Sequence, residues 1–452
     1  MPPRNAHRAC DDFHATREAT RRSYLDAGIT RRQVLARGVG AGLAVYAARA
    51  MSIADVFGAA EASAAAAPDG PILVSVFLPG GCDLLDSFVP LGQYGRYADL
   101  RPRLKQKDPA KLGGSGLGVH PSLGLGANGG VKGLFEQGKI GLLPGIDYAN
   151  PDLSHFHSRH FWESGLVTQS AATGWLGRML DRTGSADNPL QGISLSSTLS
   201  PLLRSAGAPV AAVNSPNSAQ FWIPGMYGSS LELAMGAYAE MAARPAAGPG
   251  ERAATTAARF AKQVADRLAP YRHDDDDPNP LAPAVAYPAD NDLAERLSQL
   301  AGLLSQPLGI RVAAVEADGE FDTHDSQPAD LTRGLREVSE ALSAFQADLE
   351  ARGLADRVLT FVWSEFGRRP QENESSGTDH GAGGVAWVQG TRVRSGVLTD
   401  YPDLGRLDRE DNLAVTVDFR RVYSSLLEQW LGTDAGDVIP NAAGFGRLQL
   451  VA

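Results

Sequence analysis

Residues 360–390 read TFVWSEFGRRPQENESSGTDHGAGGVAWVQG, and this is the most informative stretch of the chain. The apolar run 358–363 enters it and a second run, 384–388, leaves it. Continuous apolar runs of this length are typical of strands that are covered on both faces of a sheet. The polar, glycine-containing segment between them therefore predicts a loop at the carboxyl end of a strand, where α/β proteins present reactive groups.

This loop supplies the first candidates for a functional site, which are Glu365, Arg368, Asp379 and His380. The consecutive Asp-His pair stands between two glycines, whereas an ordinary turn needs Gly or Asp but seldom such a pair. A structural alternative stays open, in which Glu365 and Arg368 form an ion pair and Asp379 only caps a turn.

Apolar runs of the same kind recur along the chain and predict the rest of a sheet. Most are continuous stretches of Val, Ile, Leu and Phe without polar alternation, which suits strands buried on both faces. The runs outside the opening stretch are 72–78, 139–144 and 310–317.

Helical patterns lie between these runs. One covers residues 329–352, and another begins with Asp418 as a predicted N-cap and ends before Gly432. Strand and helix in succession predict an α/β fold with a doubly wound, mostly parallel sheet and helices on both faces. We expect residues 68–452 to form a single domain of this class.

The first 67 residues have the organisation of a twin-arginine export signal. Arg31-Arg32 precede an uncharged run from Gly38 to Ala48, and small residues from Ala59 to Ala67 offer Ala-x-Ala-like cleavage sites. The run has 11 residues, whereas a membrane-spanning helix needs about 20. We expect a secreted or cell-envelope protein with the twin-arginine translocation machinery as a partner and no transmembrane span in the mature chain. Retention as an uncleaved anchor is the alternative.

Charge and cysteine content exclude two further classes. The chain carries a formal net charge of −10; residues 1–67 hold nine Arg and six acidic residues, so the remainder stands at −13. Such an acidic body is a poor candidate for nucleic-acid binding, which relies on basic patches. Cys10 lies in the predicted signal and Cys82 is alone beyond it, so no internal disulfide is expected. Cys82 is either a small buried residue or a reactive thiol.

Two more clusters of polar residues follow predicted strands. Asp83 comes after the run 72–78 and a glycine turn, with an Asx turn as the structural alternative. Asp322 and His324 come after the run 310–317, and their spacing lets both side chains reach one ion from the same side of an extended segment.

Segment 150–160 reads NPDLSHFHSRH and enters a predicted helix near Ser154. At such a helix start Ser154 lies over backbone N–H groups at the positive end of the helix dipole, which binds an anion or favours an alkoxide. A simple N-cap is the alternative role. The segment also supplies His155, His157 and Arg159 as additional candidates. Elsewhere, the run Asp274–Asp277 either binds a cation or forms a solvated linker.

Carboxylates that converge with histidines repel one another unless a cation lies between them. Two like charges about 4 Å apart cost roughly 4 kcal/mol at an effective dielectric of 20. Mixed oxygen and imidazole ligands suit Zn, Mn or Fe better than Ca. We therefore expect one or two divalent transition-metal ions, held by residues from Asp83, Asp322, His324, Glu365, Asp379 and His380.

Six motifs together resemble a known family. They are Gly-Gly-Cys-Asp at 80–83, Leu-Ser-His-Phe at 153–156, Phe-Asp-Thr-His at 321–324, Ser-Glu-Phe-Gly-Arg at 364–368, Gly-Thr-Asp-His-Gly at 377–381 and Asp-Phe-Arg-Arg-Val-Tyr at 418–423. The chain resembles an exported bacterial family catalogued as a domain of unknown function, which is similar in fold to the alkaline phosphatase and sulfatase superfamily.

This resemblance implies an alkaline phosphatase-like fold, a nucleophile at Ser154, and metal ligands at Asp83, Asp322, His324, Glu365 and His380. The sequence departs from the superfamily pattern in two places. Asp322 and His324 are more closely spaced than the usual Asp and His pair, and Phe366 stands where a metal-binding histidine is expected. No Cys-x-Pro-x-Arg motif is present, so a formylglycine-type sulfatase is not expected.

The expected function is a metal-dependent hydrolase of phosphate or sulfate esters. In it Ser154 attacks or positions a metal-bound hydroxide, while Arg368 or Arg159 steadies the anionic group. The alternative is a non-catalytic envelope protein that retains the fold and binds a glycan or a protein partner. The expected ligand is accordingly an anionic ester or a glycan.

Overall fold

The computed structural model describes residues 44–46, 70–219, 248–274 and 276–452, with a few positions between 230 and 243. Most of the predicted export signal, including Cys10 and the twin arginine, lies outside the described residues. Within the described ranges no helix combines the length and the apolar character needed to cross a membrane.

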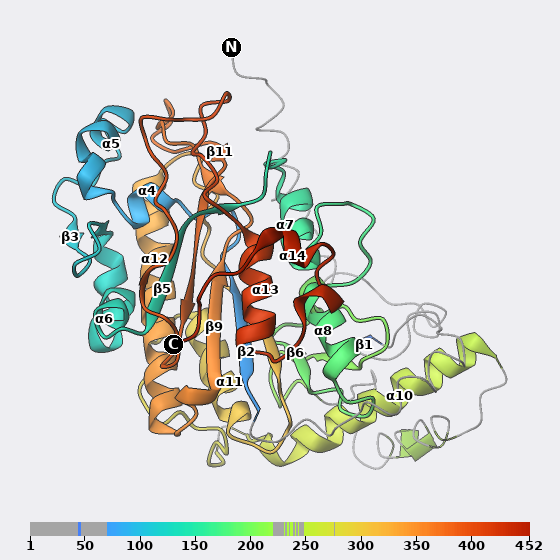
Figure 1. Ribbon diagram of the computed structural model, residues 1–452. Helices are drawn as coiled ribbons and strands as arrows, with labels where there is room; N and C mark the ends of the chain where they lie inside the picture. The colour runs from blue at the N-terminus through green and yellow to red at the C-terminus, as the bar shows by residue number, and fades with distance from the viewer. Residues whose placement is uncertain are drawn as a thin grey trace.

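A ten-stranded sheet runs through the protein (Figure 1) in the order β1-β7-β6-β8-β2-β9-β12-β5-β13, with β14 also paired to β5. The strands are β1 (Ala44–Tyr46), β2 (Ile72–Phe77), β5 (Ile140–Asp147), β6 (Gly192–Ser194), β7 (Val210–Ala212), β8 (Val312–Glu316), β9 (Val358–Trp363), β12 (Gly384–Gln389), β13 (Gly396–Val397) and β14 (Val417–Asp418). All five apolar runs singled out in the sequence are strands of this sheet: β2, β5, β8, β9 and β12.

Most neighbouring strands are parallel, as expected. Strands β7, β6, β8, β2 and β9 all run in one direction, and β13 and β14 run parallel to β5. The main exception is β12, which is antiparallel to both β9 and β5, while β1 is antiparallel to β7 at the edge. Because β12 is antiparallel to both of its neighbours, β5 and β9 run in the same direction.

Helices cover both faces of the sheet (Figure 1), which confirms the doubly wound class. One core contains residues of α6 (Gly130–Glu136), α11 (Asp292–Leu304) and α12 (Gln327–Ala351). The other contains residues of α7 (His155–Ser164), α8 (Trp175–Thr183) and α13 (Phe419–Gln429). Strand β2 contributes side chains to both cores: Val74 and Val76 belong to the first, and Leu73 and Phe77 belong to the second.

The two predicted helices correspond to α12 and α13. Asp418 caps α13 as expected, because its side chain accepts a hydrogen bond from the N–H of Arg420 at 2.9 Å. The remaining described elements are α4 (Leu84–Ser87), α5 (Tyr94–Leu100), α10 (Pro249–Leu268), α14 (Ala442–Phe445), and the short pairs β3 (Ala110–Lys111) with β4 (Gly118–Val119) and β10 (Gly367–Arg368) with β11 (His380–Gly381).

Four loops meet at one edge of the sheet because of these strand directions. The adjacent strands β8, β2 and β9 end at this edge, and β5 ends there too. Strand β12 runs the opposite way, so it begins where they end. The loops after β2, β5 and β8, and the connection 364–383 from β9 to β12, carry the predicted site residues.

Candidate metal centre

Three histidines and one carboxylate come together at this edge, and we call them the His-Asp cluster: His155, Asp322, His324 and His380. Asp322 Oδ1 lies 3.1 Å from Nε2 of His324 and 3.1 Å from Nε2 of His380, while its Oδ2 lies 3.3 Å from Nε2 of His155. The Nε2 atoms of His324 and His380 are 3.0 Å apart. The side chains of His155 and Asp322 are 2% and 1% exposed, whereas His324 and His380 are each 13% exposed, so the cluster opens to solvent on their side.

An oxygen atom orients the other nitrogen of each ring. The pairs are His155 Nδ1 with Glu365 Oε1 at 2.8 Å, His324 Nδ1 with Asp379 Oδ1 at 3.1 Å, and His380 Nδ1 with the Leu153 carbonyl at 3.0 Å. A carboxylate or carbonyl oxygen can only accept a hydrogen bond, so in each case Nδ1 carries the proton. In the neutral ring the lone pair is then on Nε2, the atom that faces the cluster.

The cluster therefore gathers acceptor atoms that repel one another. Ligand atoms of His155, Asp322 and His380 all lie within 4.8 Å of one another, and His324 adds a third imidazole. A cation between these atoms relieves the repulsion, as do protons on the rings. Three imidazole nitrogens and one carboxylate are a donor set that suits Zn, Mn or Fe. Histidine ligands whose second nitrogen is bonded to a carboxylate or carbonyl are the usual arrangement at such centres.

Asp322 is held in its charged form. Burial raises the pKa of its carboxyl, but hydrogen bonds from the three histidines, whose Nε2 atoms carry the protons when no cation is bound, and the charge of Arg368 more than reverse this and hold that pKa well below its usual range. The carboxylate therefore stays available as an anionic ligand.

Glu365 lies behind His155 rather than in the cluster. Its carboxylate accepts hydrogen bonds from the N–H of Gly80 at 3.0 and 3.1 Å and of Gly81 at 3.3 Å. Both glycines have positive φ, +113° and +83°, and a Cβ on Gly80 would lie 2.3 Å from the backbone nitrogen of Asp322. The glycine turn after β2 thus lets the loops approach closely enough for Glu365 to orient His155.

Asp379 has the same relationship to His324. The hydrogen bond from His324 lowers the pKa of Asp379 to about 2. Its side chain is 46% exposed, so Asp379 lies at the rim of the cluster.

Phe366 forms an apolar wall of the cluster. It is fully buried, and its ring centroid lies 4.9 Å from that of His155 and 4.5 Å from that of His380. The histidine that the resemblance places at this position is thus absent, while His155, from the start of α7, brings an imidazole against the Phe366 ring.

Arg368 is buried and serves the backbone and Asp322. Its Nη2 lies 2.6 Å from Asp322 Oδ1, and its side chain is 0% exposed. The remaining hydrogen bonds go to the carbonyls of Gly80, Gly81, Phe321 and Thr378. This placement orients Asp322 and leaves the guanidinium without access to a ligand in solvent.

Asp83 belongs to a neighbouring buried network. Its Oδ1 caps α4 through the N–H of Leu85 at 2.9 Å, and its Oδ2 lies 2.5 Å from Arg101 Nη1 and 2.6 Å from Gln327 Nε2. The Arg101 guanidinium thus neutralises Asp83. The Asp83 side chain contacts Arg101 and Gln327 instead of the histidines. Arg101 and Gln327 gave no sequence signal.

Ser154 stands beside the cluster at the start of α7. It is the N-cap residue by position, yet its side chain makes no capping hydrogen bond. Its neighbours on either side, Leu153 and His155, both contribute to the cluster, Leu153 through its carbonyl.

Other members of segment 150–160 point elsewhere. His157 pairs with Asp152 at 2.9 Å. Arg159 pairs with Glu163 at 3.0 Å and with Glu316 at 2.7 Å.

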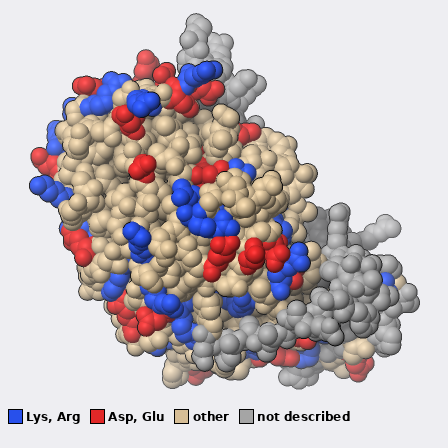
Figure 2. Space-filling view, viewed as in Figure 1, with Lys and Arg blue, Asp and Glu red and all other residues tan. Residues whose placement is uncertain are grey.

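The other sequence candidates take structural or solvated positions. Cys82 is 1% exposed, and burial raises the pKa of its thiol to about 12, so it is a buried residue and not a reactive thiol. The described members of the acidic run, Asp274, Asp276 and Asp277, are exposed. On the face shown in Figure 2, acidic and basic side chains are interspersed without an extended basic patch.

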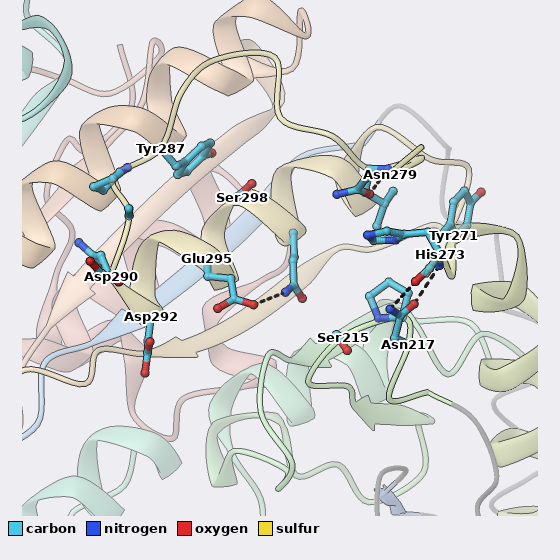
Figure 3. A pocket seen from close by; sticks show the side chains of 16 residues that line it. Ser215, Asn217, Tyr271, His273, Asn279, Tyr287, Asp290, Asp292, Glu295 and Ser298 are labelled. Carbon is cyan, nitrogen blue, oxygen red and sulfur yellow. Dashed lines mark hydrogen bonds between the residues drawn. The ribbon is translucent and has the colours of Figure 1, made fainter. Parts of the chain in front are cut away.

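A large cavity lies away from the cluster (Figure 3). It has a volume of about 650 Å³ and is lined on one side by Asp292, Glu295 and Ser298 of α11. On the other side, Asn217 and His273 are joined by two hydrogen bonds, of 2.8 and 3.0 Å. No member of the His-Asp cluster lines this cavity, so its size does not locate the chemistry.

Comparison with known proteins identifies one family. The model described as "Protein of unknown function (DUF1501)" matches residues 144–441. No curated protein matches the chain.

Two solved structures show distant likeness to this chain. Alkaline phosphatase from the Antarctic bacterium TAB5 shows 10% identity and a TM-score of 0.32, with 71% of this chain and 91% of that chain covered. A phosphonate monoester hydrolase from Silicibacter pomeroyi shows 11% identity and a TM-score of 0.31, with 84% and 75% covered. Likenesses at this level say nothing about a reaction, which has to be argued from the side chains.

Proposed function

The chain belongs to the DUF1501 family of proteins of unknown function, and we propose that it is an exported, metal-dependent hydrolase of phosphate or sulfate esters. One observation carries the proposal: ligand atoms of His155, Asp322 and His380 lie within 4.8 Å of one another, His324 Nε2 lies 3.1 Å from Asp322 Oδ1, and each ring's Nδ1 is held by an oxygen.

The ligands of the proposed metal are His155, Asp322, His324 and His380. Glu365, Asp379 and the Leu153 carbonyl orient the rings, and Arg368 orients Asp322. A divalent cation in this position supplies Lewis-acid polarisation of an ester oxygen and lowers the pKa of a bound water. Glu365 and Asp379, which the sequence suggested as direct ligands, act in this proposal through the histidines.

Ser154 is the proposed nucleophile. Its hydroxyl is not used as a helix cap, and it stands at the N-terminus of α7, where backbone N–H groups and the helix dipole favour negative charge. The same position favours binding of an anionic ester. Arg368 and Arg159 are already engaged with carboxylates, so we assign the binding of the anion to the metal and the helix N-terminus instead of to these arginines.

Export by the twin-arginine route remains part of the proposal and rests on Arg31-Arg32 and the short uncharged run that follows them. The mature protein then acts in the cell envelope or outside the cell.

Metal analysis of the exported protein tests the centre directly. We expect one or two equivalents of Zn, Mn or Fe and a lower thermal midpoint after chelation. Protein that contains no stoichiometric transition metal and is indifferent to chelator would contradict the proposal.

A panel of phosphate monoesters, phosphate diesters and sulfate esters tests the chemistry. Ser154→Ala should abolish hydrolysis, whereas Ser158→Ala, on the same helix but bonded to Tyr148 at 3.1 Å, should retain it. An unchanged rate in Ser154→Ala rules out the proposed nucleophile. A metal-loaded protein that hydrolyses no ester in the panel favours the ligand-binding alternative.

A further inference from the structure

A fully buried glutamine joins the two loops that carry most of the His-Asp cluster. Gln327 is 0% exposed and is the first residue of α12. Its Oε1 accepts hydrogen bonds from the hydroxyls of Thr323 at 3.0 Å and Thr378 at 2.6 Å. Its Nε2 donates to Asp83 at 2.6 Å and to Asp86 at 2.8 Å. Because carboxylates only accept, the amide can face these partners in one orientation alone.

Both threonines are sequence neighbours of cluster residues. Thr323 lies between Asp322 and His324, and Thr378 lies two residues before His380. The backbones of the two loops also meet, since the N–H of Thr378 donates to the carbonyl of Thr323 at 3.0 Å. A single side-chain oxygen, Gln327 Oε1, therefore sets the separation of two loops that together supply three of the four proposed ligands.

The other end of the glutamine is anchored in a buried ion network. Arg101 Nη1 lies 2.5 Å from Asp83 and 2.9 Å from Asp86, and its side chain is 0% exposed. Arg101 also donates to the carbonyls of Arg369 at 3.0 Å and Pro370 at 2.9 Å, in the loop that leads to His380. Two carboxylates share one guanidinium here, so the network needs neutral donors such as an amide and excludes a third acid at position 327.

We propose that Gln327 is a positioning residue of the metal centre, which sets the spacing of Asp322, His324 and His380 through Thr323 and Thr378. This inference rests on the metal-dependent function proposed above. Metal ligands must be placed to within a fraction of an ångström, and loss of a residue that orients them typically weakens metal binding by about 10- to 100-fold.

Paired substitutions of two buried glutamines separate positioning from general stability. Gln191 is also 0% exposed, and its side chain bonds to Ser185 and to the Pro209 carbonyl. It directly precedes β6, so it lies at the amino ends of the parallel strands, whereas the cluster lies at their carboxyl ends. Gln327→Met and Gln191→Met each replace a buried amide by an apolar side chain of similar shape. Both should therefore lower the free energy of unfolding of the metal-free protein. Only Gln327→Met should weaken binding of Zn²⁺, by roughly 10- to 100-fold in a competition titration against a chromophoric chelator.

The threonines extend the test. Thr323→Val and Thr378→Val each keep the side-chain shape and remove one hydroxyl bonded to Gln327. Each should weaken Zn²⁺ binding, and either change added to Gln327→Met should weaken it little further, because the three groups act as one unit. If Gln327→Met does not fold, the two threonine variants decide the question alone.

Two outcomes overturn the inference, and they are distinguishable. Wild-type protein that binds Zn²⁺ while Gln327→Met, or both threonine variants, bind it equally tightly removes the positioning role and leaves the metal centre standing. Wild-type protein that binds none of Zn²⁺, Mn²⁺ and Fe²⁺ removes the metal centre and the positioning role together.

Discussion

The Nε2 atoms of His324 and His380 lie 3.0 Å apart, although the Nδ1 of each ring already donates to an oxygen. Two neutral rings in this arrangement direct lone pairs at each other. A shared proton makes the contact a hydrogen bond, and a bound divalent cation makes it the edge of a coordination shell. Only the second case makes the stability of the protein depend on metal concentration.

Replacing His155 should make the free energy of unfolding nearly independent of added metal. Adding Zn²⁺ to stripped wild-type protein at about 100 times its dissociation constant should raise the free energy of unfolding by about 2.7 kcal/mol. His155→Asn removes one ligand and should lose most of this gain at the same Zn²⁺ concentration. His157→Asn is the control, since His157 lies on the same helix but pairs with Asp152. Equal stabilisation of both variants in a thermal melt contradicts the assigned ligand set.

The turn after β2 should tolerate no side chain at Gly80. Alanine there would have to adopt a φ of +113°, and its Cβ would collide with the backbone nitrogen of Asp322. We therefore expect a loss of at least about 2 kcal/mol in the free energy of unfolding. Weaker Zn²⁺ binding should accompany this loss, because Gly80 also holds Glu365. Gly92→Ala, where nothing lies within 4 Å of the added Cβ, should change neither quantity. Urea denaturation of the two variants measures the difference, and similar curves would speak against a close approach at Gly80.

The buried Asp83–Arg101–Asp86 network should be costly to break. Arg101→Met leaves two buried carboxylates without their cation, which we expect to cost about 3–5 kcal/mol. Lys132→Met removes a partly exposed pair with Glu136 on one helix and should cost no more than about 0.5 kcal/mol. If urea denaturation gives comparable costs, the network is not the structural support inferred here.

His120 should make the protein sensitive to mild acid. Burial lowers the pKa of His120 to about 4 from the ordinary 6.5, and its Nδ1 accepts a hydrogen bond from the N–H of Ser122. The unfolded chain thus takes up a proton near pH 6.5 while the folded one resists it until about pH 4. The stabilising contribution is fully present above pH 6.5 and is lost as the pH falls to 4, by about 3 kcal/mol.

The variant His120→Asn keeps an acceptor for Ser122 and removes the titration. Its free energy of unfolding should therefore fall by about 3 kcal/mol less than that of the wild type between pH 7 and pH 4. Denaturation curves at several pH values measure this, with His157→Asn, at a partly exposed position, as control. Parallel pH profiles for wild type and His120→Asn would show that another group governs acid sensitivity.

The fold was largely predictable because buried strands are continuous apolar runs. Strands β2, β8 and β9 needed nothing more than this pattern. The direction of β12 was not predictable, since a strand buried on both faces has the same composition in parallel and antiparallel pairing. Strands β6 and β7, of three residues each, are too short to stand out from their surroundings.

The sequence predicts where the site lies better than it predicts which residues contact the metal and which orient a ligand. Asp322, His324 and His380 were expected to meet because parallel strands bring their loops to one edge. Which acid contacts the cluster and which lies behind a histidine depends on packing at the ångström scale, and residue spacing does not encode it. His155 was only an additional candidate because its partner, Glu365, is 210 residues away. Gln327 was missed because a glutamine at a helix start has no chemical signature of its own.

Strand β2 has a consequence for the order in which the molecule is made. It is paired on one side with β8 and on the other with β9, so Ile72 faces Val358, and the bond from Gly80 to Glu365 spans 285 positions. Contacts of such long range cannot form until both partners have been made. A ribosome must therefore synthesise the chain as far as β9 before the middle of the sheet can close. The complete cluster needs His380 as well, so it can take up an ion only once that residue has been made.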